Sequence, residues 1–135
     1  TTNSIIVGSI SATDVDQTTP FNTGASATGT ASTSSTLDPA ADSDDLIMDT
    51  IRCGELADTP VVGADQTSRW SVGLGSFLVN AGSSQLGSAG TAMSWSWTDS
   101  DVFAHCAVAF NGIAAVDKWF QATRPHTRRN EVLMV

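Results

Sequence analysis

Residues 91–98 alternate between large apolar and small side chains, and this period of two constrains the fold more than any other feature of the sequence. In an extended chain Met93, Trp95 and Trp97 point to one side, and the smaller residues between them point to the other. The pattern is typical of a half-buried β-strand. We expect the three large side chains to fill the core, although aromatic rings on one face of a sheet also offer a platform for sugars.

Shorter strand patterns recur along the chain and are separated by turn residues. The expected strands are residues 4–11, 46–53, 69–72, 77–79, 91–98 and 102–110. Several glycines predict tight turns within residues 73–90, and two aspartates predict a turn at residues 99–101. Residues 25–37 are almost entirely Ser, Thr, Ala and Gly, which fit either a linker or strands with small side chains.

These strands, with no helical pattern before residue 112, predict an all-β fold. We expect an antiparallel β-sandwich of jelly-roll-like form. A length of 135 residues is that of one domain. Residues 1–112 would form the sandwich, and residues 113–135 would form a C-terminal arm whose first part has the apolar spacing of a short helix.

The C-terminal arm differs from the sandwich in charge. Two basic side chains face twelve acidic ones in residues 1–112, whereas four basic side chains face two acidic ones in the arm, which ends in four apolar residues. The arm could dock on its own sandwich or add a strand to a neighbouring subunit, and the opposite charges favour the neighbour. The residues expected to bind this partner are Ile113, Val116, Trp119, Phe120, Arg124, Arg128, Arg129, Val132, Leu133 and Val135.

The two cysteines lie in strands that we expect to pair. If Ile51 lies opposite Val108, then Cys53 lies opposite Cys106 and a disulfide can join the two strands. The alternative is two separate buried thiols, because cysteine is among the residues most often buried. The spacing leaves both possibilities open.

An acidic loop precedes the clearest strand and is the candidate metal site. Its aspartates, Asp38, Asp42, Asp44 and Asp45, could place several oxygens around one calcium ion. Apart from this ion we predict no cofactor. Asp14 and Asp16 form a smaller second group. The alternative is that these aspartates form turns and cap strands, which requires no metal.

The sequence predicts no catalytic site, and we expect that the protein is not an enzyme. His105 and His126 are the only histidines, and a catalytic triad or a zinc site needs partners at spacings that are not found here. His105 is expected to be packed or hydrogen-bonded within the sheet. The net charge of −8 argues against binding nucleic acid, and no apolar run is long enough to cross a membrane.

Four segments, residues 10–21, 45–49, 63–70 and 93–97, together resemble one recurrent domain in their order and spacing. This is a Gly/Ser/Thr-rich β-sandwich of bacterial secreted and surface proteins and of phage structural proteins. In such domains further strands precede the segment equivalent to residues 4–11, and these strands are not part of the present sequence. The resemblance therefore implies a truncated domain, a domain completed by a neighbouring subunit, or the product of a cleavage.

The resemblance implies a particle or surface context and no catalytic residues. We therefore expect a structural virion protein, such as a capsid decoration, spike or tail subunit at the virion surface. It would form homo-oligomers or bind other virion structural proteins through sheet edges and the C-terminal arm. The alternative is a secreted bacterial adhesion or carbohydrate-binding module that is extracellular or on the cell surface and binds a glycan.

Overall fold

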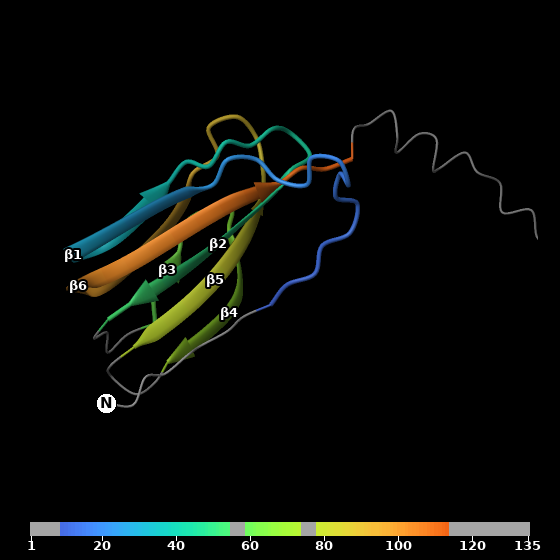
Figure 1. Cartoon of the computed structure of the whole chain (residues 1–135). Helices are drawn as coiled ribbons and strands as arrows, with labels where there is room; N and C mark the ends of the chain where they lie inside the picture. The colour runs from blue at the N-terminus through green and yellow to red at the C-terminus, as the bar shows by residue number, and fades with distance from the viewer. Residues whose placement is uncertain (1–8, 55–58, 74–77, 114–135) are drawn as a thin grey trace, which may run out of the picture.

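The structure, a computed structural model, describes residues 9–54, 59–73 and 78–113, which form one open antiparallel β-sheet (Figure 1). Its strands are β1 (Ala25–Leu37), β2 (Leu46–Cys53), β3 (Val61–Val62), β4 (Thr67–Gly73), β5 (Val79–Leu86) and β6 (Met93–Phe110). The hydrogen-bonded order is β1-β6-β2-β5-β4, and β3 also pairs with β6. The expectation of an all-β antiparallel fold is confirmed, whereas the jelly-roll-like sandwich stays a prediction.

Strands β1 and β6 form a long ribbon that bends over the rest of the sheet. The β1–β6 register shifts between Gly29 and Ser34, and Figure 1 shows the two strands turning back together at one end. Strand β6 continues through residues 99–101, so the turn predicted there is wrong. The two strands pair on both sides of this region, which keeps the backbone extended where the local sequence favours a turn.

Two further segments differ from their local sequence signals. Residues 25–37 form one strand of 13 residues rather than a linker. Residues 79–86 also form a strand, although their glycine and serines predict turns. Gly82 has a tertiary reason to be there, because a Cβ at this position would collide with the indole of Trp70.

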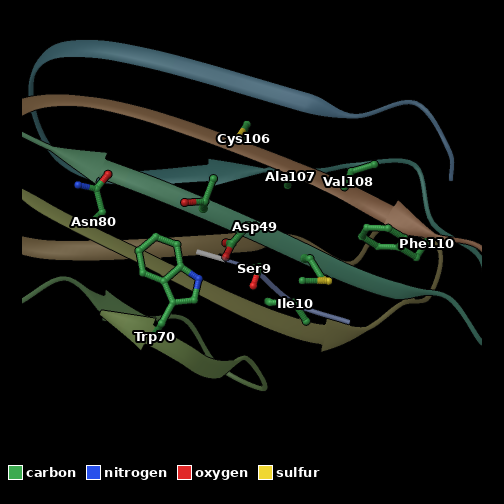
Figure 2. Close-up of a pocket in the computed structure, with 11 residues that line it drawn as sticks. Ser9, Ile10, Asp49, Trp70, Asn80, Cys106, Ala107, Val108 and Phe110 are labelled. Carbon is green, nitrogen blue, oxygen red and sulfur yellow. The ribbon is translucent and has the colours of Figure 1, made fainter. Parts of the chain in front are cut away.

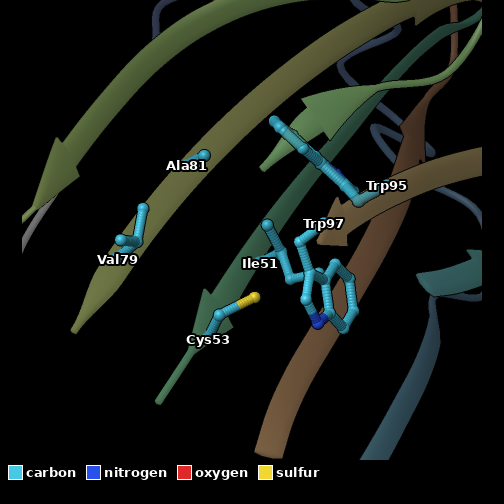
Figure 3. Packing of buried hydrophobic residues seen from close by; sticks show 6 residues of the cluster. All are labelled: Ile51, Cys53, Val79, Ala81, Trp95 and Trp97. Carbon is cyan, nitrogen blue, oxygen red and sulfur yellow. The ribbon is translucent and has the colours of Figure 1, made fainter. Parts of the chain in front are cut away.

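The core contains the large residues of the alternating segment. Met93, Trp95 and Trp97 are 0%, 2% and 6% exposed, so their predicted burial is confirmed and they offer no platform to a sugar. One apolar cluster consists of Ile51, Cys53, Val79, Ala81, Trp95 and Trp97 (Figure 3). A second consists of Leu37, Ile47, Met93, Ala107 and Ala109. The first half of β6 therefore packs across the face of β2 and β5.

The segment before β1 lies along the end of β6. Val15 and Phe21 form isolated bridges with Gly112 and Phe110, and the backbone N–H of Ile113 donates to the carbonyl of Asp14 over 3.0 Å. Residues 9–11 form no strand, so the described part of the strand predicted over residues 4–11 is wrong. Ser9 and Ile10 instead line a groove on one face of the sheet.

Candidate functional site

A buried polar network crosses the core between the two apolar clusters, and Asp49 is its centre. One carboxylate oxygen, Oδ1, accepts from the backbone N–H and the hydroxyl of Ser83 at 2.9 and 2.6 Å. The other oxygen, Oδ2, accepts from the indole N–H of Trp95 at 2.7 Å and from Gln66 Nε2 at 3.5 Å. The carboxylate is thus held by donors from β5, β6 and the loop before β4, which compensates for its burial.

His105 extends the network to β1. Its Nε2 lies 3.1 Å from Asp49 Oδ2, and its Nδ1 lies 2.9 Å from the hydroxyl oxygen of Ser35. In the tautomer with the proton on Nε2, the ring donates to the carboxylate and Nδ1 accepts a hydrogen bond from the Ser35 hydroxyl. The expectation that His105 is hydrogen-bonded within the sheet is confirmed.

The order Ser35, His105, Asp49 is that of a hydrolase triad, but the geometry differs in two respects. In the serine hydrolases the nucleophile contacts Nε2 and the acid contacts Nδ1, whereas here the two nitrogens are exchanged. Ser35 is also only 6% exposed, and the side chains of His105 and Asp49 are fully buried. A substrate therefore has no path to the hydroxyl in this conformation, and these three residues join β1, β6 and β2. The absence of enzyme activity stays a prediction.

The opposite face of the sheet carries a groove of about 670 Å³. Its lining is mainly apolar and comes from the outer faces of β2 and β6, from β4 and β5, and from the N-terminal segment (Figure 2). The residues that line it are Ser9, Ile10, Met48, Asp49, Thr50, Trp70, Asn80, Cys106, Ala107, Val108 and Phe110. We call it the outer groove.

Trp70 and Cys106 give the outer groove a wall and a reactive thiol. The indole of Trp70 lies against Gly82 and forms a wall, since any larger residue at position 82 would displace the ring. Cys106 is exposed on the floor as a free thiol. Although the residue is exposed, partial burial of its sulfur, with a smaller contribution from the charge of Asp49, raises the pKa of this thiol.

The free edge of β1 is a second surface with the character of an interaction site. Within the described residues β1 pairs with β6 alone, so one side of its backbone has no strand partner. The strand has the sequence Ala-Ser-Ala-Thr-Gly-Thr-Ala-Ser-Thr-Ser-Ser-Thr-Leu, without charge or proline. Natural edge strands are commonly protected by lysine, proline or a short length. Only the irregular register near its middle interrupts this edge.

The structure separates the two cysteines. The predicted pairing of residues 46–53 with the last strand is confirmed, but the register is wrong, since Cys53 lies opposite Phe103 and Cys106 lies opposite Thr50. Cys106 is three positions along β6 from Phe103, the residue opposite Cys53. Because successive side chains of a strand alternate between its two faces, this odd offset places the two cysteines on opposite faces of the sheet. Cys53 is buried in the core and Cys106 is exposed in the outer groove, so both are free thiols and no disulfide joins them.

The acidic loop is organised by hydrogen bonds from Asp45. Its Oδ2 accepts from the backbone N–H of Asp42 at 2.8 Å and from Asn22 Nδ2 at 3.2 Å, and its Oδ1 accepts from the N–H of Gly112 at 3.1 Å. Asp45 is buried, whereas Asp38, Asp42 and Asp44 are exposed. No group of three or more acids, histidines or cysteines within the described ranges is placed to hold a metal ion. Calcium at this loop stays a prediction.

The smaller acidic group behaves as a turn. Asp16 Oδ1 accepts from the backbone N–H groups of Thr18 and Thr19 at 2.7 and 3.1 Å. These bonds stabilise the charged form and lower the pKa of this exposed carboxyl, the bond from Thr19 contributing most. Its geometry is that of a turn-forming aspartate.

Of the residues predicted to bind a partner, only Ile113 is placed. Its backbone is bonded to Asp14 as described above. The other predicted contacts, from Val116 to Val135, and the predicted short helix lie outside the described residues. The binding role of the C-terminal arm therefore stays a prediction.

Comparison with family models, curated proteins and solved structures found no match to this chain. In the part of the chain that the structure describes, no helix has the length and apolar character needed to cross a membrane. The fold and the surfaces above thus define the class of protein, which is an all-β protein with one open sheet and a polar centre.

The network around Asp49 was not predicted from the sequence, although a signal for it was present. Asp49 stands between Ile47 and Ile51 on the same face of the clearest strand, so alternation alone places a carboxylate toward the core. A charge at such a position needs partners. Those partners come from β5 and β6, which no local pattern reveals.

Proposed function

We propose that this chain is a structural, non-enzymatic subunit of a virion, such as a capsid decoration, spike or tail subunit, that assembles through the edge of β1. The uncharged edge of 13 residues is the observation that carries the proposal. The particle context is supported by the resemblance of the sequence to domains of phage structural and bacterial surface proteins.

The β1 edge suits an added strand for a physical reason. An extended edge presents a row of backbone N–H and C=O groups, and a second strand that pairs with them gains hydrogen bonds along its length. Apart from the buried Leu37, the side chains of β1 are small, and most of its serines and threonines are exposed, so an incoming strand would meet no bulky or charged group. Strand addition of this kind is a recurrent mode of protein recognition.

The proposed donor is the C-terminal arm of a neighbouring copy. Its last five residues, 131–135, are one acid followed by four apolar residues, which is a short strand-like segment. The arm is basic while residues 1–112 are strongly acidic, so attraction between copies would favour the encounter. In this arrangement the added strand would extend the sheet toward a jelly-roll-like sandwich.

The experiment places charge on the edge and measures assembly. Ser26 and Thr28 are exposed on β1, and the double variant Ser26→Lys with Thr28→Lys should protect the edge as lysines do in natural sheets. We expect the unaltered chain to form large assemblies in sedimentation velocity and the double variant to stay monomeric. Deletion of residues 113–135 should have the same effect.

The matched control is Ser96→Lys, which adds the same charge at an exposed position of β6 that is paired on both sides. This variant should assemble normally. Assembly of the double variant, or a monomeric unaltered chain at all concentrations, would refute the proposed role of the edge. A monomer that binds glycans would instead support the alternative of a secreted adhesion module, which loses one support because Trp95 and Trp97 are buried.

A further inference from the structure

We propose that the outer groove is the docking site of this chain's own residues 4–8, Ser-Ile-Ile-Val-Gly. The inference concerns the face of the sheet rather than its β1 edge, and it is independent of the proposed function. It rests on the chemistry of the groove, on the position of Ser9 and Ile10, and on the sequence that directly precedes them.

The lining of the outer groove is mainly apolar and therefore favours an apolar occupant. Val108 and Phe110 lie on its floor and end, and the indole of Trp70 forms the opposite wall (Figure 2). Met48 adds a further apolar side chain to the lining. Surfaces of this kind gain free energy when water leaves them. Asn80 adds a side-chain amide among these apolar groups, which suits an occupant whose own backbone carries donors and acceptors.

The N-terminal segment already enters the groove. Ser9 and Ile10 line it, and Figure 2 shows both over the same face of the sheet as Trp70. The side chain of Ile10 is still 44% exposed, so a neighbouring apolar group could cover it further. Residues 4–8 are joined to Ser9 directly and need no loop to reach the site.

The length and the pattern of residues 4–8 both fit. An extended residue advances about 3.3 Å, so five residues span about 17 Å, while neighbouring strands lie only about 4.8 Å apart. The segment can therefore cross several strands of the sheet. In an extended chain Ile6 lies on the same side as Ile10, which lines the groove, so Ile6 is the side chain expected to enter it.

The reactivity of Cys106 measures directly whether the groove is covered, because its thiol lies on the floor of the groove. The rate at which N-ethylmaleimide modifies Cys106 in the full chain reports how often the groove is open. We expect Ile6→Asp to raise this rate by about tenfold, equivalent to a loss of about 1.4 kcal/mol of docking free energy, because a carboxylate resists transfer into an apolar site. Ile6→Val should leave the rate within about twofold of the unaltered chain, because it keeps an apolar group there.

The matched control is Thr2→Asp, which adds the same charge to the same terminus outside residues 4–8. It should leave the rate unchanged. Cys53 is an internal control for folding, because it is buried and stays unmodified as long as the sheet is intact. A variant whose Cys53 reacts is unfolded. If Ile6→Asp unfolds, Ile6→Ser replaces it, because a hydroxyl also resists transfer into an apolar site, and a rate equal to that of the unaltered chain would again overturn the proposal.

Two results would overturn the proposal. Equal rates in Ile6→Asp and the unaltered chain would show that residues 4–8 do not cover the groove. A rate that falls as protein concentration rises would show that a second copy covers it instead. Protection that depends on Ile6 and is the same at every concentration is the result that supports docking within one chain.

Discussion

His105 Nε2 lies 3.1 Å from Asp49 Oδ2 inside the sheet, and neither side chain reaches solvent. This contact joins the two central strands, β6 and β2, in a polar layer between two apolar clusters. A polar layer of this kind is satisfied in only one alignment of the strands, since a shift would leave the carboxylate and its donors unpaired. We infer that it helps to select the register in which the cysteines lie apart.

Removal of the Asp49 carboxylate should be strongly destabilising. Asp49→Ala leaves the donors of Ser83, Trp95 and His105 buried without their acceptor, and we expect a loss of about 3–5 kcal/mol in the free energy of unfolding. Urea denaturation measures this change. Asp99→Ala is the control, because Asp99 is exposed on β6 and its removal should change stability by less than about 0.5 kcal/mol.

Ser35 should not react as a nucleophile. Its hydroxyl is bonded to His105 and the residue is 6% exposed, so a fluorophosphonate reagent should fail to label the folded protein at this position. Mass spectrometry of peptides after treatment gives the result. Labelling at Ser35 that disappears in His105→Asn would contradict both the structural role of the network and the expectation that the protein is not an enzyme.

The stability of the protein should fall at alkaline pH because of Cys53. Burial, with a smaller contribution from Asp101, raises the pKa of this thiol from its ordinary value of 9.0 to about 12. The folded state therefore keeps a proton that the unfolded state releases, so stability is present below pH 9 and is lost as the pH rises toward 12. The chain contains no tyrosine, which leaves few other groups to titrate in this range.

Urea denaturation between about pH 8 and pH 11 tests this dependence on Cys53, since the range extends from about one unit below to about two units above the ordinary thiol pKa of 9.0. Cys53→Ala should be less stable at neutral pH because it leaves a cavity, but its stability should decline less steeply with rising pH. Cys106→Ala serves as the comparison, because the raised pKa of that thiol acts in the same direction from an exposed position. An unchanged slope in Cys53→Ala would contradict the assignment.

The packing of Trp70 against position 82 should require glycine there, because glycine has no Cβ. A Cβ at position 82 would meet the indole, so Gly82→Ala should displace the ring and cost about 1–3 kcal/mol in the free energy of unfolding. In a Trp70→Ala background the same change should cost much less, because no ring remains to be displaced. A double-mutant cycle by urea denaturation measures the difference, and equal costs in both backgrounds would exclude this contact as the cause.

Local patterns were sufficient for part of the fold. Alternating and β-branched residues predict β2 with its observed bounds, and the spacing of Met93, Trp95 and Trp97 predicts which side of β6 is buried. Both succeed because the side-chain period of a strand depends only on neighbouring residues. The all-β class follows from the repetition of such segments.

Tertiary structure decided what depends on residues far apart in the chain. Strand β1 has no local signal of its own and is extended because β6 pairs with both of its halves, and β5 tolerates Gly82 because Trp70 covers it. The register that separates Cys53 from Cys106, and the donors that converge on Asp49, likewise arise from several strands at once. Such alignments are set by the combined packing and hydrogen bonding of the whole sheet, so no single segment of this sequence could reveal them.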